Sequence, residues 1–499
     1  MIPVILAAVS LILSLLLSAY SMRSLLFSFA AIREIHKKGL SSHNLYKSSS
    51  VSVLEDILPT IGTNLSSNIK NSNSSSLKMK ESTISKTTSA RMKEFSSPFI
   101  SILVATYNER LIIDRLMRSC AELTYNSEEF EIIIVDDSED GTFDVLRKWK
   151  RKISNLKIIH RNERTGWKGG ALNLALKNLS VKSSYVLVVD ADSILVSDIL
   201  KRFAAYFSKY SSNGIYIDAI QGYPISSVFN NAINNNASVA ITTNANWVAR
   251  GIDFRLAQRN IMEFLAKNRI NLPVQITGSL FMIRTDLIKQ LGFSNDLGED
   301  WELTLNLYIH RNIRSSYSNE GNSNSWKNTN SKKVIFDPLL VSYCEASTKL
   351  RPYFRQRMRV SEGHTRAFTR NLLGLLTSKI ALIDKMEFFF MGGQYAKFVP
   401  LFALIIIDCM ILASSGIDFI VTNNLMNLTL KIQIANILAI IGTTLLAVRL
   451  CSYIRNYNMT DALYLLLLTI CTVPALVIGC LKGFFRKQGT FYKTERNSS

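Results

Sequence analysis

Apolar residues along the chain follow two kinds of pattern, long uncharged stretches toward the two ends and short runs in the middle. Residues 2–21, 398–416, 432–450 and 462–481 are almost free of charge, and about 20 apolar residues suffice for a helix to cross a bilayer. Between residues 98 and 368, short apolar runs alternate with segments of helical spacing. Strands that alternate with helices form parallel sheets. The pattern predicts an α/β domain with a mostly parallel sheet, plus N-terminal and C-terminal transmembrane helices.

The individual elements follow from the spacing of apolar positions. The predicted strands are 99–105, 131–135, 156–160, 185–189, 215–221, 273–282 with an interruption at Gly278, 334–337 and 339–343. The predicted helices are 111–120, one through Lys150, 171–178, 299–310 and a basic helix from residue 350. We expect the Asn- and Ser-rich stretch at 315–333 to be a surface loop.

Two acids directly follow the apolar strand predicted at 185–189. Asp190 and Asp192 stand one residue apart, and ligands of open α/β sheets bind beyond the carboxyl ends of the strands. Carboxylates suit hard divalent cations, which take their remaining ligands from water and substrate phosphates. The stretch indicates a metal-diphosphate site, with a solvated turn at the strand end as the alternative. Asp136 and Asp137 follow another strand in the same way, and there the alternative is a helix N-cap.

Composition narrows the classes of function. The formal net charge is +20, but Lys and Arg are spread along the chain without the aromatic residues of a single-strand-binding surface, so we expect no nucleic-acid partner. Basic residues beside apolar spans are explained by membrane orientation and anionic lipid. The six cysteines have neither a disulfide framework nor a zinc-site spacing.

The terminal segments predict an integral, multi-pass membrane protein. We expect an anchor at 1–38, rather than a cleaved signal peptide, because no basic segment precedes the apolar run. A Ser/Asn-rich disordered linker follows at 39–97. An amphipathic helix lying in the membrane interface is expected at 376–396, and transmembrane helices at 397–484.

The basic tail at 485–499 conflicts with this count of spans. One anchor and three further spans would leave the tail outside if the central domain is cytoplasmic, whereas basic segments favour the cytoplasmic side. Either one span is miscounted or the tail is an exception, and we favour the first. Asp408 lies inside a span, where a charge is costly. It could line a passage, pair with a basic neighbour or lie near the end of the span.

Seven short motifs occur in an order that resembles a known family. They are Thr106-Tyr107-Asn108-Glu109, Val135-Asp136-Asp137, Lys168-Gly169-Gly170-Ala171-Leu172, Asp190-Ala191-Asp192, Thr277-Gly278-Ser279, Glu299-Asp300 and Gln356-Arg357-Met358-Arg359. In this order they resemble the membrane-embedded family 2 glycosyltransferases, especially cellulose, mannan and hyaluronan synthase-like enzymes. The resemblance implies a GT-A domain, for which we expect the bounds 98–375.

The resemblance also implies roles for these residues. The residues expected around the nucleotide sugar are Thr106, Tyr107, Glu109, Asp136, Asp137, Lys168, Asp190, Gln356, Arg357 and Arg359. Asp190 and Asp192 would hold Mg²⁺ or Mn²⁺ against the diphosphate. Asp300 would be the general base that takes a proton from the acceptor hydroxyl. From Glu299 and Asp300 alone, acids placed favourably in the first turn of a helix are the preferred explanation, and the other motifs favour Asp300 as base.

One position departs from the family pattern. Val360 stands where the family has a Trp that stacks on the acceptor sugar, which favours transfer of one or a few sugars over long polymer synthesis. Trp301 could replace it, although core packing is the simpler role. His364 is expected to be structural.

Taken together, we expect an inverting glycosyltransferase at the cytoplasmic face of the plasma membrane. It would move sugar from a UDP- or GDP-linked donor to a lipid-linked or polysaccharide acceptor and form a β-glycosidic bond, in contact with membrane lipid. The alternative is a catalytically silent membrane sensor or partner subunit that binds a nucleotide sugar.

Overall fold

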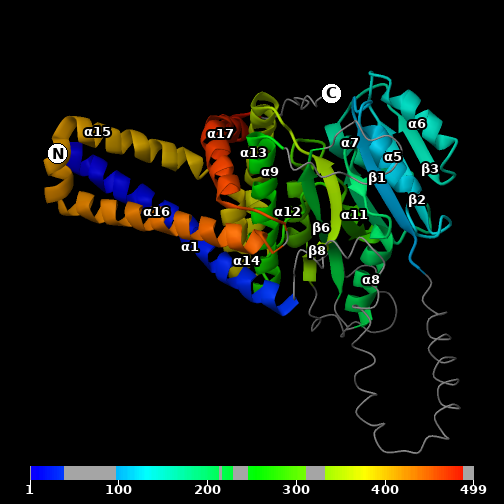
Figure 1. Ribbon diagram of the computed structural model, residues 1–499, viewed down its shortest axis with the longest axis horizontal. Helices are drawn as coiled ribbons and strands as arrows, with labels where there is room; N and C mark the ends of the chain where they lie inside the picture. Colours follow the sequence, from blue (N-terminus) through cyan, green and yellow to red (C-terminus); the bar gives the residue numbers. More distant parts are fainter. Residues whose placement is uncertain are drawn as a thin grey trace, which may run out of the picture.

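A computed structural model of the chain describes residues 2–38, 97–212, 216–228, 245–310, 332–453 and 455–486. Figure 1 shows a mixed α/β domain at one end and a lobe of long helices at the other. The predicted linker up to residue 96, most of the insertion at 315–333 and the tail beyond residue 486 lie outside the described residues.

One mixed sheet organises the α/β domain. Its strands are β1 (Ile100–Thr106), β2 (Phe130–Asp136), β3 (Leu156–His160), β4 (Tyr185–Asp190), β5 (Ile194–Leu195), β6 (Ile217–Ser227), β7 (Phe281–Arg284) and β8 (Lys332–Glu345). The spatial order is β3-β2-β1-β4-β7-β6-β8-β5. Neighbours from β3 to β4 are parallel, β7 is antiparallel to both its neighbours, and β6 and β8 are parallel. The predicted α/β class and mostly parallel sheet are confirmed.

Alternating strand residues fill two hydrophobic cores. Ile102 and Val104 of β1 pack with residues of α5 (Ile113–Ala121), α6 (Thr142–Lys150) and α8 (Ile199–Ser212). Leu103 belongs to the opposite core, with residues of α7 (Trp167–Lys177), α10 (Leu265–Ile270) and α12 (Glu299–Ile309). The period of two along each strand therefore places helices on both faces of the sheet.

Several predicted elements differ from the structure. The expected strand at 273–282 begins only at Phe281, because Gly278 and Leu280 have left-handed φ values of 80° and 52°, which an extended strand cannot accommodate. Helix α7 begins at Trp167 rather than Ala171, so Lys168 lies in its first turn. The two segments predicted at 334–337 and 339–343 form the single strand β8.

A run of helices connects the domain to the lobe. Helix α9 (Trp247–Ala257) continues through the π-helix η2 (Gln258–Phe264) into α10. Helix α11 (Thr285–Leu291) follows β7, and α13 (Leu350–Thr377) and α14 (Leu382–Gly392) come after β8, the last strand of the sheet. Helix α14 lies within the stretch predicted to be interfacial. Its outward side chains Leu382, Ile383 and Met386 are exposed.

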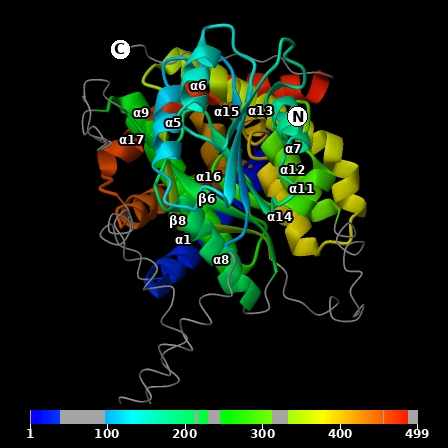
Figure 2. The same cartoon turned by 90° about the vertical axis from the view of Figure 1, so that its right-hand side faces the viewer.

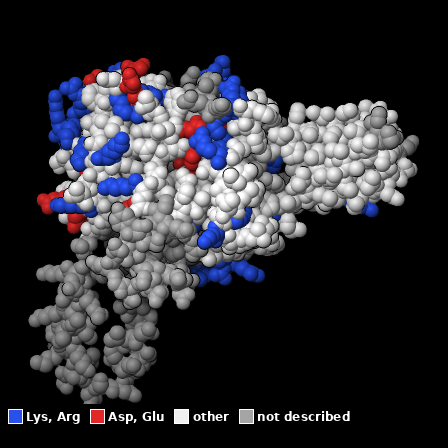
Figure 3. Space-filling model, turned by 180° about the vertical axis from the view of Figure 1, so that it is seen from behind, with Lys and Arg blue, Asp and Glu red and all other residues white. Residues whose placement is uncertain are grey.

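Four described helices are long and apolar enough to cross a membrane. They are α1 (Ile2–Lys38), α15 (Phe398–Thr422), α16 (Asn424–Cys451) and α17 (Met459–Phe485). Helices α1, α15 and α16 pack together as the lobe, which runs along the long axis of the molecule (Figure 1). Figure 3 shows that the lobe surface is almost free of charged side chains on the face it presents. Both features agree with the prediction of membrane association.

Asp408 of α15 is held inside the lobe by neighbouring helices. The Ser10 hydroxyl donates to its Oδ1 at 2.6 Å and the Gln433 amide donates to its Oδ2 at 2.8 Å. The hydrogen-bond partners of Asp408 are therefore polar side chains of α1 and α16, and the suggested basic partner does not appear among them. Such hydrogen bonds between helices satisfy a polar group that lipid cannot.

A buried group of four charged side chains joins α1 to the domain. Arg23 of α1 lies 2.7 Å from Glu263 and 2.5 Å from Glu387 of α14, and Lys267 lies 2.7 and 2.9 Å from the same two acids. Lys267 has no exposed side-chain surface. Burial opposes the charge on Glu263, but Lys267 and Arg23 hold its pKa well below the ordinary value. The two charges of each sign balance within the group.

We therefore expect Lys267→Met to destabilise the protein by about 3–5 kcal/mol, the usual cost of leaving a buried charge unpaired. Thermal unfolding in detergent measures the effect, with the exposed Lys201→Met of α8 as the matched control. Adding Glu263→Gln balances the charges again and should recover part of the loss. Equal melting temperatures for Lys267→Met and Lys201→Met would contradict this interpretation.

Candidate active site

The carboxyl ends of β1, β2 and β4 open into a cavity of about 520 Å³. Its wall also includes residues from α7, α9, α12 and α13. All but one of the predicted site residues line it, namely Thr106, Tyr107, Glu109, Asp137, Lys168, Asp190, Asp192, Asp300, Gln356, Arg357 and Arg359. The fold thus brings together residues that span some 250 positions of the chain.

Asp136 is the predicted site residue that lies outside the cavity wall. Its side chain is fully buried, and its Oδ1 accepts hydrogen bonds from the hydroxyls of Thr106 and Ser138, both at 2.6 Å. Its Oδ2 lies 2.9 Å from Nδ1 of His160. These contacts tie together the ends of β1, β2 and β3. Of the two adjacent acids, Asp137 is therefore the one that faces the cavity.

Asp137 anchors a cationic and aromatic group at one end of the cavity. Arg161 donates to both of its oxygens, at 2.6 and 2.5 Å. Arg164 lies 3.8 Å from the same carboxylate and 3.6 Å from the ring centroid of Tyr107. A guanidinium flat on an aromatic ring forms a planar surface on which a base or sugar can stack.

Lys168 connects the acids of the cavity. Its Nζ donates to Oδ1 of Asp190 at 2.6 Å and to the carbonyl of Gly278 at 2.7 Å, and lies 3.6 Å from Glu299. Burial opposes its charge, yet Asp190 and Glu299 raise its pKa above the ordinary value, so Lys168 is a permanent cation. Glycine is favoured at 278 because its φ of 80° lies in the left-handed region, and a Cβ there would also lie 3.2 Å from Oδ2 of Asp300.

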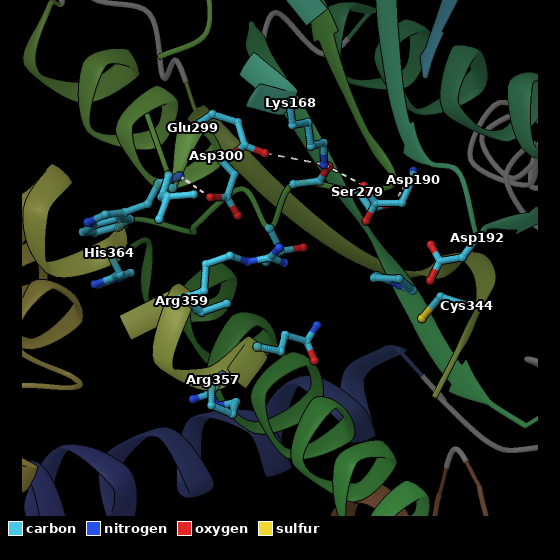
Figure 4. Close-up of a pocket in the computed structure, with 18 of the residues that line it drawn as sticks. Lys168, Asp190, Asp192, Ser279, Glu299, Asp300, Cys344, Arg357, Arg359 and His364 are labelled. Carbon is cyan, nitrogen blue, oxygen red and sulfur yellow. Dashed lines mark hydrogen bonds and ion pairs between the residues drawn. The ribbon is translucent and has the colours of Figure 1, made fainter. Parts of the chain in front are cut away.

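Asp300 lies in the first turn of α12, where its Oδ1 accepts a hydrogen bond from the backbone N–H of Trp301 at 2.8 Å. Burial, with the charge of Glu299 added, raises its pKa to about 7, although Lys168 acts in the opposite direction. A carboxylate with such a pKa can accept a proton near neutral pH. Figure 4 shows Asp190 and Asp192 on one side of the cavity, Asp300 on the other, and Arg359 reaching between them.

The chemistry of Asp190 and Asp192 fits a divalent cation. Mg²⁺ is usually held by one or two carboxylates, with the remaining oxygens supplied by water and substrate phosphates. No group of three or more His, Cys, Asp or Glu residues that could hold a metal by itself occurs among the described residues. Two carboxylates at an open strand end therefore suit a cation that arrives with a diphosphate.

His364 lies beyond Asp300. The sequence predicted only a structural role for this residue. Its ring stacks on Trp301, with centroids 4.6 Å apart and planes within 8°, and its Nε2 accepts from the Gln394 amide at 2.8 Å. Burial and then Arg357 lower its pKa to about 3, so it is neutral at physiological pH. Trp301 is 1% exposed and is therefore a core residue, as predicted, rather than a replacement for the missing Trp.

Sequence reasoning missed the residues that α9, η2 and the chain after α14 bring to this end of the cavity. They are Ile252, Arg255, Leu256, Arg259, Gln394 and Tyr395. The segment 245–267 has no strong motif, so only the spacing of Arg255 and Arg259, four residues apart on one helical face, could have suggested them.

The comparisons with known proteins agree with this geometry. Residues 101–290 match the family model described as Glycosyl transferase family 2. The chain carries a family 2 glycosyltransferase domain. The matched range contains β2 to β7, all but the first residue of β1, Lys168, and the acids Asp190 and Asp192. Asp300, Gln356, Arg357 and Arg359 follow it in the chain.

Two curated relatives each match about a quarter of this chain. The poly(ribitol-phosphate) beta-glucosyltransferase of Bacillus spizizenii is 35% identical over 124 residues, which cover 25% of this chain and 19% of the relative. The beta-monoglucosyldiacylglycerol synthase of Trichormus variabilis is 34% identical over 124 residues, covering 24% and 26%. The chain thus matches about a quarter or less of the length of either relative.

A solved structure supports the fold over a longer range. The mannosyltransferase PcManGT from Pyrobaculum calidifontis, determined with GDP-Man and Mn²⁺, aligns with a TM-score of 0.50 at 16% identity. The alignment covers 83% of this chain and 97% of that one. Together with the family match it confirms the GT-A-like fold of the glycosyltransferase domain.

Proposed function

We propose that the protein is an inverting, metal-dependent glycosyltransferase that moves a sugar from a nucleotide diphosphate to a membrane-associated acceptor. The observation that carries this proposal is the placement of Asp300, with a pKa of about 7, across one cavity from Asp190 and Asp192. A single base opposite a diphosphate site is what an inverting displacement needs. The family match supports the same class of reaction.

Each side chain has a definite part in the proposed reaction. Tyr107, Arg164 and Asp137 hold the nucleotide, while Lys168 and Arg359 balance the charge of the diphosphate as it leaves. Asp190 and Asp192 would hold Mg²⁺ or Mn²⁺, which lowers the energy of the leaving diphosphate. Asp300 accepts the proton of the acceptor hydroxyl, whose oxygen forms the new bond to the anomeric carbon as the bond to the diphosphate breaks.

Val360 bears on the length of the product. It lines the cavity and is 37% exposed, at the position where the family has a Trp. Without an aromatic surface at this position, a growing glycan loses a stacking partner. We therefore propose that the enzyme transfers one or a few sugars, and that this chain does not synthesise a long polysaccharide.

Asp300→Asn should lower turnover by about 100- to 10,000-fold, the usual contribution of a positioned base. The assay is release of nucleoside diphosphate from a panel of UDP- and GDP-sugars by the purified protein, with Mn²⁺ or Mg²⁺ and total membrane lipid as the acceptor source. Asn keeps the size of the side chain, and Asp286→Asn, on the surface of α11, is the matched control.

The same assay separates the two hypotheses. Metal-dependent turnover of one donor that is lost in Asp300→Asn supports the transferase. Nucleotide binding without turnover of any donor, even with lipid present, would favour the sensor or partner subunit.

The pH dependence of kcat/KM should follow the protonation of Asp300. Because its pKa is raised to about 7, the base is deprotonated above that pH and protonated below it. We expect a plateau above pH 7 and about a tenfold loss for each pH unit below it, measured with a saturating metal concentration. A rate that stays constant between pH 5 and 7 would contradict the assignment of Asp300 as base.

The arrangement of the helices suggests which of them cross the membrane. Helices α1, α15 and α16 run along the long axis, whereas α17 runs across it beside α13 in both views (Figures 1 and 2). A Cβ at Gly479 would lie 2.3 Å from the backbone carbonyl oxygen of Met358 on α13, so the two helices pack at close range. We propose that α17 lies at the membrane surface and that three helices span.

This arrangement removes the conflict over the basic tail. After α16 returns to the side of the α/β domain, α17 stays on that side, and Arg366 of α13 donates to the carbonyl of Arg486 just beyond it. The outward stripe of α17, including Leu463, Leu466 and Ile470, is exposed and suits the lipid interface. The cytoplasmic domain and the basic tail then share one face of the plasma membrane, as positive-inside orientation requires.

Green fluorescent protein fused after Ser499 should therefore fluoresce, because it folds to its fluorescent form on the cytoplasmic side. Alkaline phosphatase fused at the same position should be inactive. A fusion after Asn423, between α15 and α16, is the control and should give the reverse pattern. Active phosphatase at Ser499 would show that α17 crosses the membrane.

A further inference from the structure

Three arginines line the end of the cavity that lies next to the membrane lobe. Arg255 is on α9, Arg259 on η2 and Arg357 on α13. Helix η2 packs against α1, and its Glu263 pairs with Arg23 of that helix. Arg357 also lies 5.2 Å from the ring of Tyr395, which follows the interfacial helix α14. The three cations therefore gather where the cavity meets the membrane region.

Within the described residues, these arginines have no ion pair with a carboxylate. The Nε atoms of Arg255 and Arg259 are buried without a hydrogen-bond partner. By contrast, Arg250 on the same helix as Arg255 pairs with Asp461 at 2.7 Å. Burial and the neighbouring charge of Arg255 lower the pKa of Arg259 to about 10. Like charges held together in a partly buried wall are costly unless an anion compensates them.

The nucleotide end of the cavity already has its own cations. Lys168, Arg161 and Arg164 surround Asp137 and Asp190, and Arg359 reaches toward them (Figure 4). Arg357 points away from that group in the same view. Arg259 lies close enough to Asp300 for its charge to act on that carboxylate. A second anion, separate from the donor diphosphate, would therefore lie close to the base.

We infer that Arg255, Arg259 and Arg357 bind the phosphate of a membrane lipid that serves as the acceptor. This inference rests on the proposed function, because it names the class of acceptor for the same cavity. Arginine binds phosphate oxygens through paired N–H donors. Ile252 and Leu256 of α9 also line this end and provide apolar contacts for the first part of the lipid chain. The position beside α1 favours a lipid over a soluble phosphate.

Direct binding tests this site without requiring turnover. The full chain in lipid nanodiscs is titrated with a polyprenyl monophosphate and, separately, with the same polyprenol lacking the phosphate. We expect the phosphate form to bind at least about tenfold more tightly, because hydrogen bonds to charged groups are the strong ones. Arg255→Gln and Arg259→Gln should each remove most of this preference. Arg269→Gln, an exposed arginine on α10, is the matched control and should leave the preference unchanged.

Thermal unfolding separates a binding role from a structural one. Removing one of three mutually repelling cations should leave the melting temperature equal or higher, whereas loss of a structural arginine would lower it. A large drop in melting temperature without a change in lipid preference would overturn the inference.

The remaining outcomes are equally distinct. Equal binding of polyprenol and its phosphate would overturn the inference. It would also be overturned if UDP displaced the lipid and bound more weakly to Arg259→Gln, because the arginines would then bind the donor. Inorganic phosphate that competes at the same concentration as the lipid would point to a soluble phosphate acceptor instead. Donor turnover on a neutral lipid that is unaffected by Arg259→Gln would contradict the lipid-phosphate acceptor but would still support the proposed glycosyltransferase. Absence of turnover with any donor would contradict the proposed glycosyltransferase function itself.

Discussion

The balanced charges of Arg23, Glu263, Lys267 and Glu387 fix the relation between the membrane lobe and the α/β domain. They join α1, η2, α10 and α14 at one buried point. Because each cation contacts both acids, no single pair can separate without leaving a buried charge. A buried charge group adds little net stability over apolar packing, but in this protein the pairing of all four charges favours the observed docking geometry over others. The cavity therefore keeps a fixed position relative to the lobe, and its arginine-lined end faces the membrane region.

The sequence predicted β1 to β4 within one or two residues of their observed bounds. Strands β1, β2 and β4 consist mostly of buried Ile, Leu and Val, while the edge strand β3 is partly exposed. Strand β6 extends to Ser227, beyond the predicted end at residue 221. The prediction was wrong at 273–280, where the residues have a strand-like pattern but the backbone of Gly278 and Leu280 is left-handed. Apolar residues indicate burial and carry no information about such a turn. Gly278 permits this turn, because a left-handed φ is open to glycine at no steric cost.

Site residues that stand in short sequence motifs were predicted, whereas residues that only the tertiary structure brings to the cavity were missed. Acids at strand ends and the paired basic residues of α13 stand in short motifs, and the fold brings nearly all of them to one cavity. The sequence did not show which of Asp136 and Asp137 faces the cavity, because adjacent residues at a strand end point to opposite sides. The hydrogen bonds from Thr106 and Ser138 show that Asp136 is the internal one. Arg255 and Arg259 could not be found at all. They matter only because the fold brings them to the same cavity as Arg357 of α13, more than 90 residues away in the chain.

The π-helix η2 sets the rotational phase between the cavity residues of α9 and the membrane contact of α10, which belong to one continuous helix. Its wider turn contains about one residue more than an α-helix would in the same length, and π-turns inside helices occur frequently at functional sites. Arg259 lies at its beginning and Glu263 near its end. If the same residues formed an ordinary α-helix, the extra residue would rotate everything after it by roughly 100° about the helix axis. Arg255 would still face the cavity while Lys267 turned away from Glu387, so the wider turn is what allows one continuous helix to make both contacts.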